Sequence, residues 1–349
     1  MLRGRRISGG LTEPRPRDRP PTIVDIARAA GVSRTTVSAA LSGKGRLSEA
    51  TRARVREVAE QLQYVANPSA RHLQAGRTGA IGVYISEMLF RFGFYMEFVF
   101  GAALAARSET FALTVMTASG PSPTAVGHVD GAIVVDPVIG DPYVRTLIES
   151  GVPVVAAERC LEPGLTPRVT IETDYQGAQR DLLDHLLARG ARRPALIGME
   201  MDISVGHRLD AIYRRWCVEH GIEPCIRKVP LDRVPAGLHD AARELLTGPQ
   251  PPDAILGAGD GVALAVQAAA RDAGRTVGRD LLTASSVDSE PLRLVTPSIT
   301  AIDAPPRDIG RDAARTMLDV LRDEDVPAEL LRPKPTIALR ESTAGMLGG

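Results

Sequence analysis

The chain has 349 residues, which at about 150 residues per domain corresponds to two or three domains. Its 44% hydrophobic and 24% charged residues are ordinary for a globular protein and exclude collagen-like, mucin-like and wholly disordered chains. The formal net charge is zero, but residues 1–77 contain 15 Lys and Arg against six Asp and Glu, whereas the rest contains 27 against 36. A basic first quarter on an acidic body indicates a segment that binds a polyanion.

The first 21 residues are rich in Gly, Ser, Pro and Arg, and we expect a disordered basic tail. The tail lacks the apolar stretch of a secretory signal. The three cysteines, Cys160, Cys217 and Cys225, form no CxxC pair and cannot all be bridged, which is typical of a reducing compartment. A cytoplasmic protein is therefore expected.

Residues 22–66 predict three short helices. Thr22 and Asp25 resemble a capping box at the start of the first, Ser33 can cap the second and Ser48 the third. Apolar residues at helical spacing predict the buried faces; they are Ile23, Ile26, Ala27 and Ala30, then Val37, Ala40 and Leu41, then Val55, Val58, Ala59 and Leu62. Gly31 lies in the turn between the first two helices, and this pattern indicates a helix-turn-helix domain. In that geometry, the outward residues of the second helix face the major groove: Arg34, Thr35, Ser38 and Ala39.

Residues 67–78 predict a short linker helix. Asn67 is a good N-cap, Pro68 suits the first helical position and Gly76 a C-terminal stop. A helix of about two turns is marginal in water, so we expect it to form only when a partner stabilises it. The linker is therefore a switch-like element.

Residues 79–349 alternate short apolar runs with helical stretches. Strands are expected over 80–85, 112–116, 131–135, 152–156, 194–198, 254–257 and 281–284, and helices over 176–189, 207–220, 238–246, 261–273 and 309–321. This alternation predicts two doubly wound lobes with parallel sheets, an α/β fold. Ligands of such folds bind in the loops after the carboxyl ends of the strands.

The segment 88–106 is nearly apolar and contains five of the six phenylalanines, Phe90 among them. A membrane span is disfavoured because Arg91 and Glu97 lie inside it. Two interpretations stay open: packing in the core and in a dimer, or stacking of Phe90 and its neighbours on the ring of a bound effector.

Signatures of catalysis, metal binding and cofactor binding are lacking in the sequence. The segment from Gly257 to Val262 lacks the third glycine of a dinucleotide-binding motif. The six histidines are scattered without metal-ligand spacing, and no GxSxG motif occurs. We therefore expect no cofactor, no metal and no enzymatic activity.

The stretch from Thr22 to Gly82 resembles the DNA-binding headpiece of the LacI family of transcription regulators. The residues that carry the resemblance are Thr22 to Ala27, Gly31 to Ser33, Thr36 to Ser38, Thr51, Arg52, Tyr64, Asn67 and Ala70 to Leu73. Looser matches continue in the body at Val129 to Gly131, Gly151 to Val155, Gly177, Ala178, Arg208 to Asp210, Pro252 to Ile255, Thr296, Pro297 and Arg340 to Thr343. The resemblance implies a periplasmic-binding-protein-like effector domain after the headpiece. It divides this domain into an N-terminal lobe (about 79–172 and 303–325) and a C-terminal lobe (about 173–302 and 326–345).

The resemblance also implies site residues for DNA. The base-reading face is Arg34, Thr35 and Ser38, and Leu73 is an apolar wedge that unstacks a base step in the minor groove. The full implied DNA interface is Thr22, Ser33, Arg34, Thr35, Thr36, Ser38, Ala39, Tyr64, Asn67, Ser69, Ala70, Arg71 and Leu73. Ala39 stands where the family usually has an arginine, so one common base contact is missing.

For the effector, the resemblance nominates Arg208 and Asp288, with Asp260 and Glu158 as further candidates beside Phe90. A guanidinium and carboxylates that face a cleft can bind vicinal hydroxyls or a purine edge. The chain departs from the family at Gly259 and at Ser286 to Ser289. The link from Thr117 to His128 is too short for the family's usual helix, which implies a trimmed N-terminal lobe.

The sequence thus predicts a sequence-specific transcriptional repressor. We expect a homodimer that binds double-stranded DNA at a pseudo-palindromic operator and responds to a small-molecule effector, a sugar or sugar derivative. No leucine heptads end the chain, which favours a dimer over a tetramer. The alternative is a ligand-binding or enzymatic α/β body whose headpiece is vestigial. Whether the effector weakens or strengthens DNA binding is open.

Overall fold

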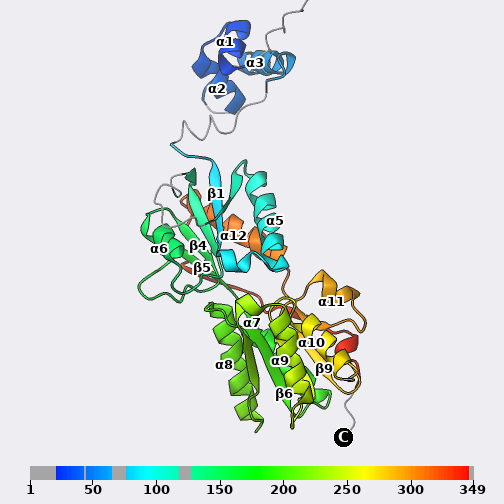
Figure 1. Cartoon of the computed structure of the whole chain (residues 1–349). Helices are drawn as coiled ribbons and strands as arrows, with labels where there is room; N and C mark the ends of the chain where they lie inside the picture. The colour runs from blue at the N-terminus through cyan, green and yellow to red at the C-terminus, as the bar shows by residue number, and fades with distance from the viewer. Residues whose placement is uncertain (1–20, 43–44, 65–75, 118–125, 127, 346–349) are drawn as a thin grey trace, which may run out of the picture. The chain divides into compact units, whose positions relative to one another are not determined.

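The computed structural model describes residues 21–42, 45–64, 76–117, 126 and 128–345. The chain forms two compact units, Met1–Arg71 and His72–Gly349, which are treated separately below. The first unit contains the helices α1 (Ile23–Ala30), α2 (Arg34–Ser42) and α3 (Glu49–Gln61), as the sequence predicts (Figure 1).

The headpiece core is formed by one face of each helix. Ile26, Ala30, Val37 and Val55 are almost completely buried. Leu62, which was expected on the buried face of α3, is instead 36% exposed. The reason is that α3 ends at Gln61, where the left-handed backbone of Gln63 turns the chain away from the helical periodicity.

The caps of these helices confirm the pattern in the sequence. The carboxylate of Asp25 accepts hydrogen bonds from the backbone N–H of Thr22 (2.9 Å) and from its hydroxyl (2.7 Å). The hydroxyl of Ser33 accepts from the N–H of Thr36 at 3.0 Å, and Ser48 caps α3 in the same way. Gly31 adopts the left-handed backbone (φ 64°) that ends α1 and starts the tight turn to α2.

The second unit contains two six-stranded sheets, one in each lobe, within the described residues. The first-lobe sheet has the order β11-β5-β4-β3-β1-β2 and is parallel throughout. The second-lobe sheet has the order β12-β10-β9-β8-β6-β7, and only β12 is antiparallel. The strands are β1 (Ala80–Ile85), β2 (Ala112–Met116), β3 (Gly131–Val135), β4 (Val154–Ala157), β5 (Val169–Thr173), β6 (Pro194–Met199), β7 (Ile226–Val229), β8 (Ala254–Ala258), β9 (Leu282–Ser285), β10 (Thr300–Asp303), β11 (Glu329–Arg332) and β12 (Thr336–Ala338).

Helices cover both faces of each sheet, which confirms the doubly wound fold. In the first lobe, α5 and α12 pack together on one face, and α6 lies on the other; in the second, α9 and α10 pair, as do α7 and α8 (Figure 1). The helices are η1 (Glu87–Leu89), α5 (Gly93–Ser108), α6 (Pro142–Glu149), α7 (Tyr175–Ala188), α8 (Ser204–Glu219), η3 (Leu231–Arg233), α9 (Ala236–Thr247), α10 (Val262–Asp272), α11 (Glu290–Leu294), α12 (Pro306–Leu321) and η4 (Glu341–Thr343).

The chain crosses between the lobes after β5, after β10 and after β11. The predicted lobe boundary at 325/326 is wrong, because β11 pairs with β5 and so belongs to the first lobe. The last crossing therefore lies between Arg332 and Thr336. Of the predicted short link 117–128, residues 118–125 and 127 lie outside the described residues.

The apolar segment 88–106 forms η1 and most of α5. Phe98 and Ala102 of α5 are fully buried in the first-lobe core, which confirms the packing interpretation for this face. Of the helices that the structure describes, none combines the length and the apolar character needed to span a bilayer.

The backbones of α5 and α12 touch at two reciprocal glycines. A Cβ atom added at Gly101 would lie 1.9 Å from the carbonyl oxygen of Arg307, and one added at Gly310 would lie 2.0 Å from that of Phe98. Since backbone atoms cannot rotate away, any side chain at either position forces the helices apart. Both glycines are therefore required by this close contact.

We predict that Gly101→Ala destabilises the body by about 3 kcal/mol, the upper end of typical overpacking costs. The melting temperature should fall by roughly 5–10 °C. Gly206→Ala in α8 is the matched control, because its nearest backbone oxygen, that of Met201, lies 3.4 Å from the added Cβ. Equal melting temperatures for the two variants in differential scanning calorimetry would contradict the close contact.

Candidate functional site

The start of α2 presents the predicted base-reading residues. Arg34 and Thr35 are exposed, whereas Ser38 and Ala39 are half-buried. No carboxylate of the described residues forms an ion pair with Arg34. A helix N-terminus with an exposed guanidinium is the part of a helix-turn-helix that contacts base edges.

Four further residues of the predicted DNA interface lie at or near the ends of the helices. The hydroxyls of Ser33 and Thr36 are 2.8 Å apart and share one hydrogen bond, which leaves further capacity in each. Tyr64 is half-buried against the headpiece core just after α3. The hydroxyl of Thr22 donates to Asp25. The linker residues predicted at the DNA lie outside the described residues; they are Asn67, Ser69, Ala70, Arg71 and Leu73.

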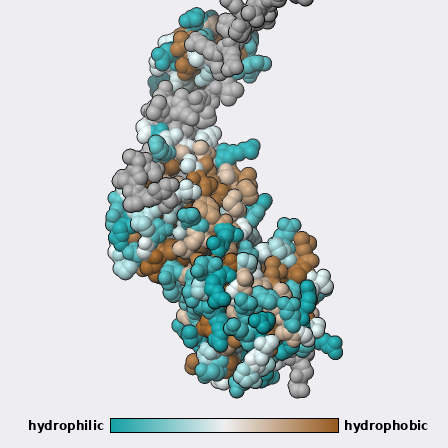
Figure 2. Space-filling view, viewed as in Figure 1, coloured by the Kyte–Doolittle hydropathy of each residue, from teal (hydrophilic) through white to brown (hydrophobic). Residues whose placement is uncertain are grey.

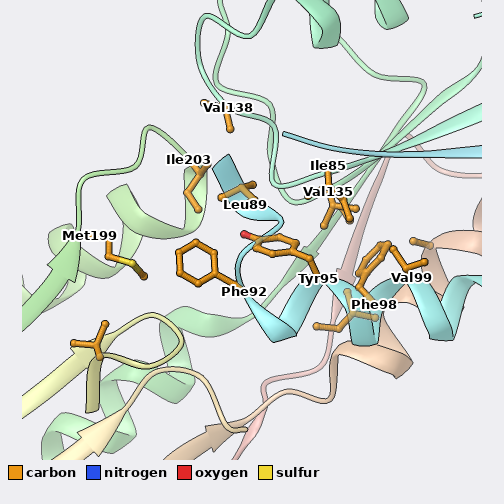
Figure 3. Close-up of a cluster of buried hydrophobic side chains, with 14 of the residues drawn as sticks. Ile85, Leu89, Phe92, Tyr95, Phe98, Val99, Val135, Val138, Met199 and Ile203 are labelled. Carbon is orange, nitrogen blue, oxygen red and sulfur yellow. The ribbon is translucent and has the colours of Figure 1, made fainter. Parts of the chain in front are cut away.

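A cavity that is partly open to solvent lies between the two lobes of the body. Most of its wall is apolar. Figure 3 shows the ring of Phe92 between the side chains of Tyr95 and Met199 in that view. The lining residues are Phe92, Phe94, Tyr95, Phe98, Val135, Asp136, Ala157, Glu158, Tyr175, Met199, Met201, Ile203, Val205, Gly206, Leu209, Lys228, Ala258, Gly259, Asp260, Ser286, Val287 and Ile309.

The first-lobe wall of the cavity contains two buried carboxylates. Asp136 follows β3 directly, and its Oδ2 accepts a hydrogen bond from the hydroxyl of Tyr95 at 2.8 Å. Glu158 follows β4, and its Oε1 accepts from the N–H of Thr173 at 3.0 Å. Burial raises the pKa of Asp136 to about 6. The pKa of Glu158 is raised to about 7, mainly by burial and secondly by the nearby Asp136 carboxylate.

Both carboxylates sit on left-handed backbone. The φ angles are 44° at Asp136 and 83° at Glu158, a region that side-chain-bearing residues seldom adopt. Such backbone strain clusters at functional sites, where the surrounding structure holds it in place. Two strained residues at the ends of adjacent strands therefore make this wall the candidate site of the body.

An ion network connects this wall to the second lobe. The guanidinium of Arg208, from α8, bonds to the carboxylates of Glu158 and Glu172. Glu172 also pairs with Arg159. The Arg208 side chain is therefore engaged by carboxylates from the first-lobe sheet.

The second-lobe wall provides fewer polar groups. The Oδ2 of Asp260, after β8, accepts from the N–H of Gly93 in the first lobe at 3.2 Å. The Oγ of Ser286 accepts from the N–H of Gly259 at 3.2 Å. Lys228 pairs with Asp210 at 2.7 Å.

The five residues predicted for the effector are placed differently from one another. Glu158 and Asp260 line the cavity, and Arg208 contacts Glu158. Phe90 and Asp288 do not line it. Phe90 caps the end of η1 and packs against the core, so the next aromatic residues, Phe92 and Phe94, reach the cavity in its place.

Asp288 is held by two arginines. Arg340 bonds to both of its carboxylate oxygens (2.9 and 2.8 Å), and Arg293 bonds to Oδ2 at 2.7 Å. These bonds, of which the side-chain bond to Arg340 is the strongest, keep the pKa of Asp288 below its ordinary value despite burial. The side chain is 3% exposed, so it acts as a structural clamp on the segment that follows β12.

Sequence reasoning missed Asp136, Tyr95, Tyr175 and Lys228. The signal for Asp136 was present, since it is the first residue after a predicted strand and the carboxyl ends of parallel strands form the site. Lys228 lies in β7, and Tyr175 follows β5 at the start of α7. Both strands are too short and too polar for their apolar residues to stand out in the sequence.

Comparisons with known proteins agree with this geometry. Residues 22–67 match the lacI family of bacterial regulatory proteins, and residues 183–343 match the periplasmic binding protein-like domain. The HTH-type transcriptional regulator CelR of Thermobifida fusca is 31% identical over 296 residues, which cover 82% of this chain and 87% of CelR. Catabolite control protein A of Priestia megaterium is 29% identical over 293 residues, with coverage of 80% and 86%.

Two solved structures share the fold over almost the whole chain. The CelR–cellobiose complex has a TM-score of 0.67 at 29% identity and covers 92% of this chain and 99% of its own. The lac repressor dimer bound to operator and the anti-inducer ONPF has a TM-score of 0.78 at 23% identity, with coverage of 93% and 99%.

A helix-turn-helix headpiece followed by a two-lobed body with a cavity between parallel sheets defines a DNA-binding transcription regulator. The chain belongs to the lacI family of bacterial regulatory proteins.

The raised pKa of Asp136 predicts a pH-dependent effect of Asp136→Asn on stability. Because the folded-state pKa (about 6) exceeds the unfolded one, wild-type stability falls as pH rises through 6, and the variant escapes this loss. From pH 5 to pH 8, the free energy of unfolding of the variant should gain about 1–2 kcal/mol relative to wild type. Urea unfolding at several pH values measures this difference.

Asp232→Asn, at an exposed position on η3, is the control and should show no such trend. A difference between Asp136→Asn and wild type that stays constant from pH 5 to pH 8 would refute the burial of an ionisable Asp136.

Proposed function

We propose that this regulator is a repressor that binds a pseudo-palindromic operator as a homodimer and responds to a sugar or sugar derivative in the body cavity. The observation that carries the proposal is the exposed Arg34 at the start of α2, which pairs with no carboxylate of the described residues, joined in one chain to a body with an interlobe cavity. We place this regulator in the cytoplasm, where it meets DNA, and we assign it no catalytic activity. CelR, a relative solved with cellobiose, supports a sugar-like effector.

The headpiece supports the DNA-binding role in detail. Its caps and its apolar core are complete, which disfavours the alternative of a vestigial headpiece. Arg34 can bind a guanine with two hydrogen bonds, while Ser33, Thr36 and Tyr64 position the domain on phosphates.

The cavity supports effector control. Gly93 and Asp260 meet across the lobes, as do Arg208 and Glu158, so a ligand between them changes contacts of both lobes. The effector can shift operator affinity by no more than the ratio of its own affinities for the two lobe arrangements. The change in operator affinity when effector is added distinguishes the two mechanisms. An inducer lowers the affinity, and a corepressor raises it.

An exposed apolar stripe on α5 supports the dimer. Met96, Phe100 and Leu104 are 42%, 49% and 57% exposed and recur every four residues, so they share one helix face. Figure 2 shows apolar side chains gathered over α5. Large contiguous apolar patches on a protein surface mark interfaces, and here we assign the patch to a second copy of the chain.

We predict that Leu104→Glu weakens dimerisation by about tenfold or more, because it places an unpaired charge in an apolar interface. Sedimentation velocity over a range of protein concentrations measures the dissociation constant. Val218→Glu, at a 74% exposed position on α8, is the matched control and should leave the constant unchanged. An unaltered dimer with Leu104→Glu, or a monomeric wild type, would count against this face.

The DNA-binding role is tested by selecting duplexes on the full-length protein and measuring affinity by fluorescence anisotropy. Wild type should prefer one duplex, with affinity falling steeply as salt rises, because phosphate contacts release counterions. Arg34→Ala should relax discrimination at one base position by about 1–3 kcal/mol.

Arg28→Ala, at an exposed position on α1, should leave base discrimination intact and serves as the control. A uniform loss of affinity across all duplexes with Arg34→Ala would assign Arg34 to a phosphate. Failure of the wild type to select any duplex would reject the repressor function itself.

A further inference from the structure

The cavity walls hold an excess of negative charge. Asp136, Glu158 and Glu172 of the first lobe are accompanied by two guanidiniums, that of Arg159 in the same lobe and that of Arg208 from α8 of the second lobe. Both guanidiniums bind Glu158 or Glu172. One carboxylate, that of Asp136, is therefore left without a hydrogen-bonded cation among the described residues.

The second-lobe wall adds to this excess. Lys228 lines the cavity but already pairs with Asp210, and Asp260 is held only by the backbone N–H of Gly93. Within the described residues, the pairing therefore leaves two cavity-lining carboxylates, those of Asp136 and Asp260, without a hydrogen-bonded cation.

Asp136 combines this charge with an unused hydrogen-bonding atom. The residue is 7% exposed, and its Oδ1 is buried without a hydrogen-bond partner among the described residues, although Oδ2 accepts from Tyr95. A buried carboxylate oxygen without a partner is costly, and such a group in a native structure calls for a missing partner. Asp136 also lines the cavity, so a bound ligand can supply that partner.

The remaining wall limits what else the ligand can be. Phe92, Phe94 and Met199 lie among many apolar lining residues, which favour a ligand with an apolar face or ring. A neutral polyhydroxylated ligand would leave the excess charge uncompensated. A ligand with one cationic group would compensate one of the two carboxylates, that of Asp136.

We propose that the effector carries a protonated amine whose ammonium group binds Asp136, with an apolar ring face against Phe92 and Phe94. An amino sugar is the sugar derivative with this chemistry, and a small aryl amine shares it. Asp136 is then the residue that selects a cationic over a neutral effector. This inference deepens the proposed effector role of the cavity and depends on it.

Two matched ligand pairs test the ammonium group. The first is the β-1,4-linked glucosamine disaccharide against cellobiose, and the second is 2-phenylethylamine against 2-phenylethanol. Isothermal titration calorimetry on the full-length protein at pH 7.5 measures each affinity. At least one amine should bind about tenfold or more tightly than its neutral partner, because hydrogen bonds to a charged group are the stronger ones.

Asp136→Asn assigns the preference to one residue. The variant keeps the shape of the side chain and should abolish the advantage of the amine, because it lowers the affinity of the amine about tenfold or more relative to that of its neutral partner. Asp232→Asn, on exposed η3, is the control and should retain the advantage. The melting temperature of each variant confirms that it is folded.

The outcomes separate this inference from the effector role. Binding of neither amine, or equal binding of amine and neutral partner, overturns the inference. An amine advantage that persists in Asp136→Asn overturns the assignment to Asp136. If cellobiose binds and changes operator affinity while the amines do not bind, the effector role stands and the inference fails. If an amine binds through Asp136 without changing operator affinity, the ligand class stands and the effector role fails.

Discussion

The contact between α5 and α12 is the interaction on which the body depends. The chain returns to the first lobe through α12, and Gly101 and Gly310 let the two backbones touch. Helix α5 carries Tyr95, with Phe92 at its N-cap, to the cavity and leaves Phe100 exposed on another face. One helix therefore connects the cavity wall with the proposed dimer face. Because packed interiors transmit displacement with little compression, we expect a shift of the first turn to be felt at that face.

The cavity wall is costly to the fold in two ways. Asp136 and Glu158 are both buried, and both have left-handed backbone. Apolar residues in extended backbone would be more stable at the ends of these strands. Shifted pKa values and backbone strain together are typical of functional sites.

The sequence predicted the elements whose residues are uniformly apolar. The bounds of β1, β2 and β3 agree with the predicted runs, whereas β5, β7 and β11 were missed because polar residues alternate with or replace apolar ones there. The site was predicted in part. Glu158 and Asp260 follow predicted strands, so the carboxyl-end rule places them at the cavity. The role of Asp288 could not be predicted, because its partner Arg340 lies 52 residues later in the chain and only the fold brings the two together.

Arg208 shows how the cavity can control the lobes. The resemblance nominated it as an effector ligand, but in the structure its guanidinium from the second lobe is shared by Glu158 and Glu172 of the first. A ligand that took Glu158 from Arg208 would remove one of the two ion pairs by which Arg208 joins the lobes. A ligand that binds Asp136 leaves these pairs intact and adds contacts beside them. Under the proposed function, such a ligand would stabilise the lobe arrangement in which Arg208 bridges the two lobes, and the operator affinity of that arrangement decides the sign of the coupling.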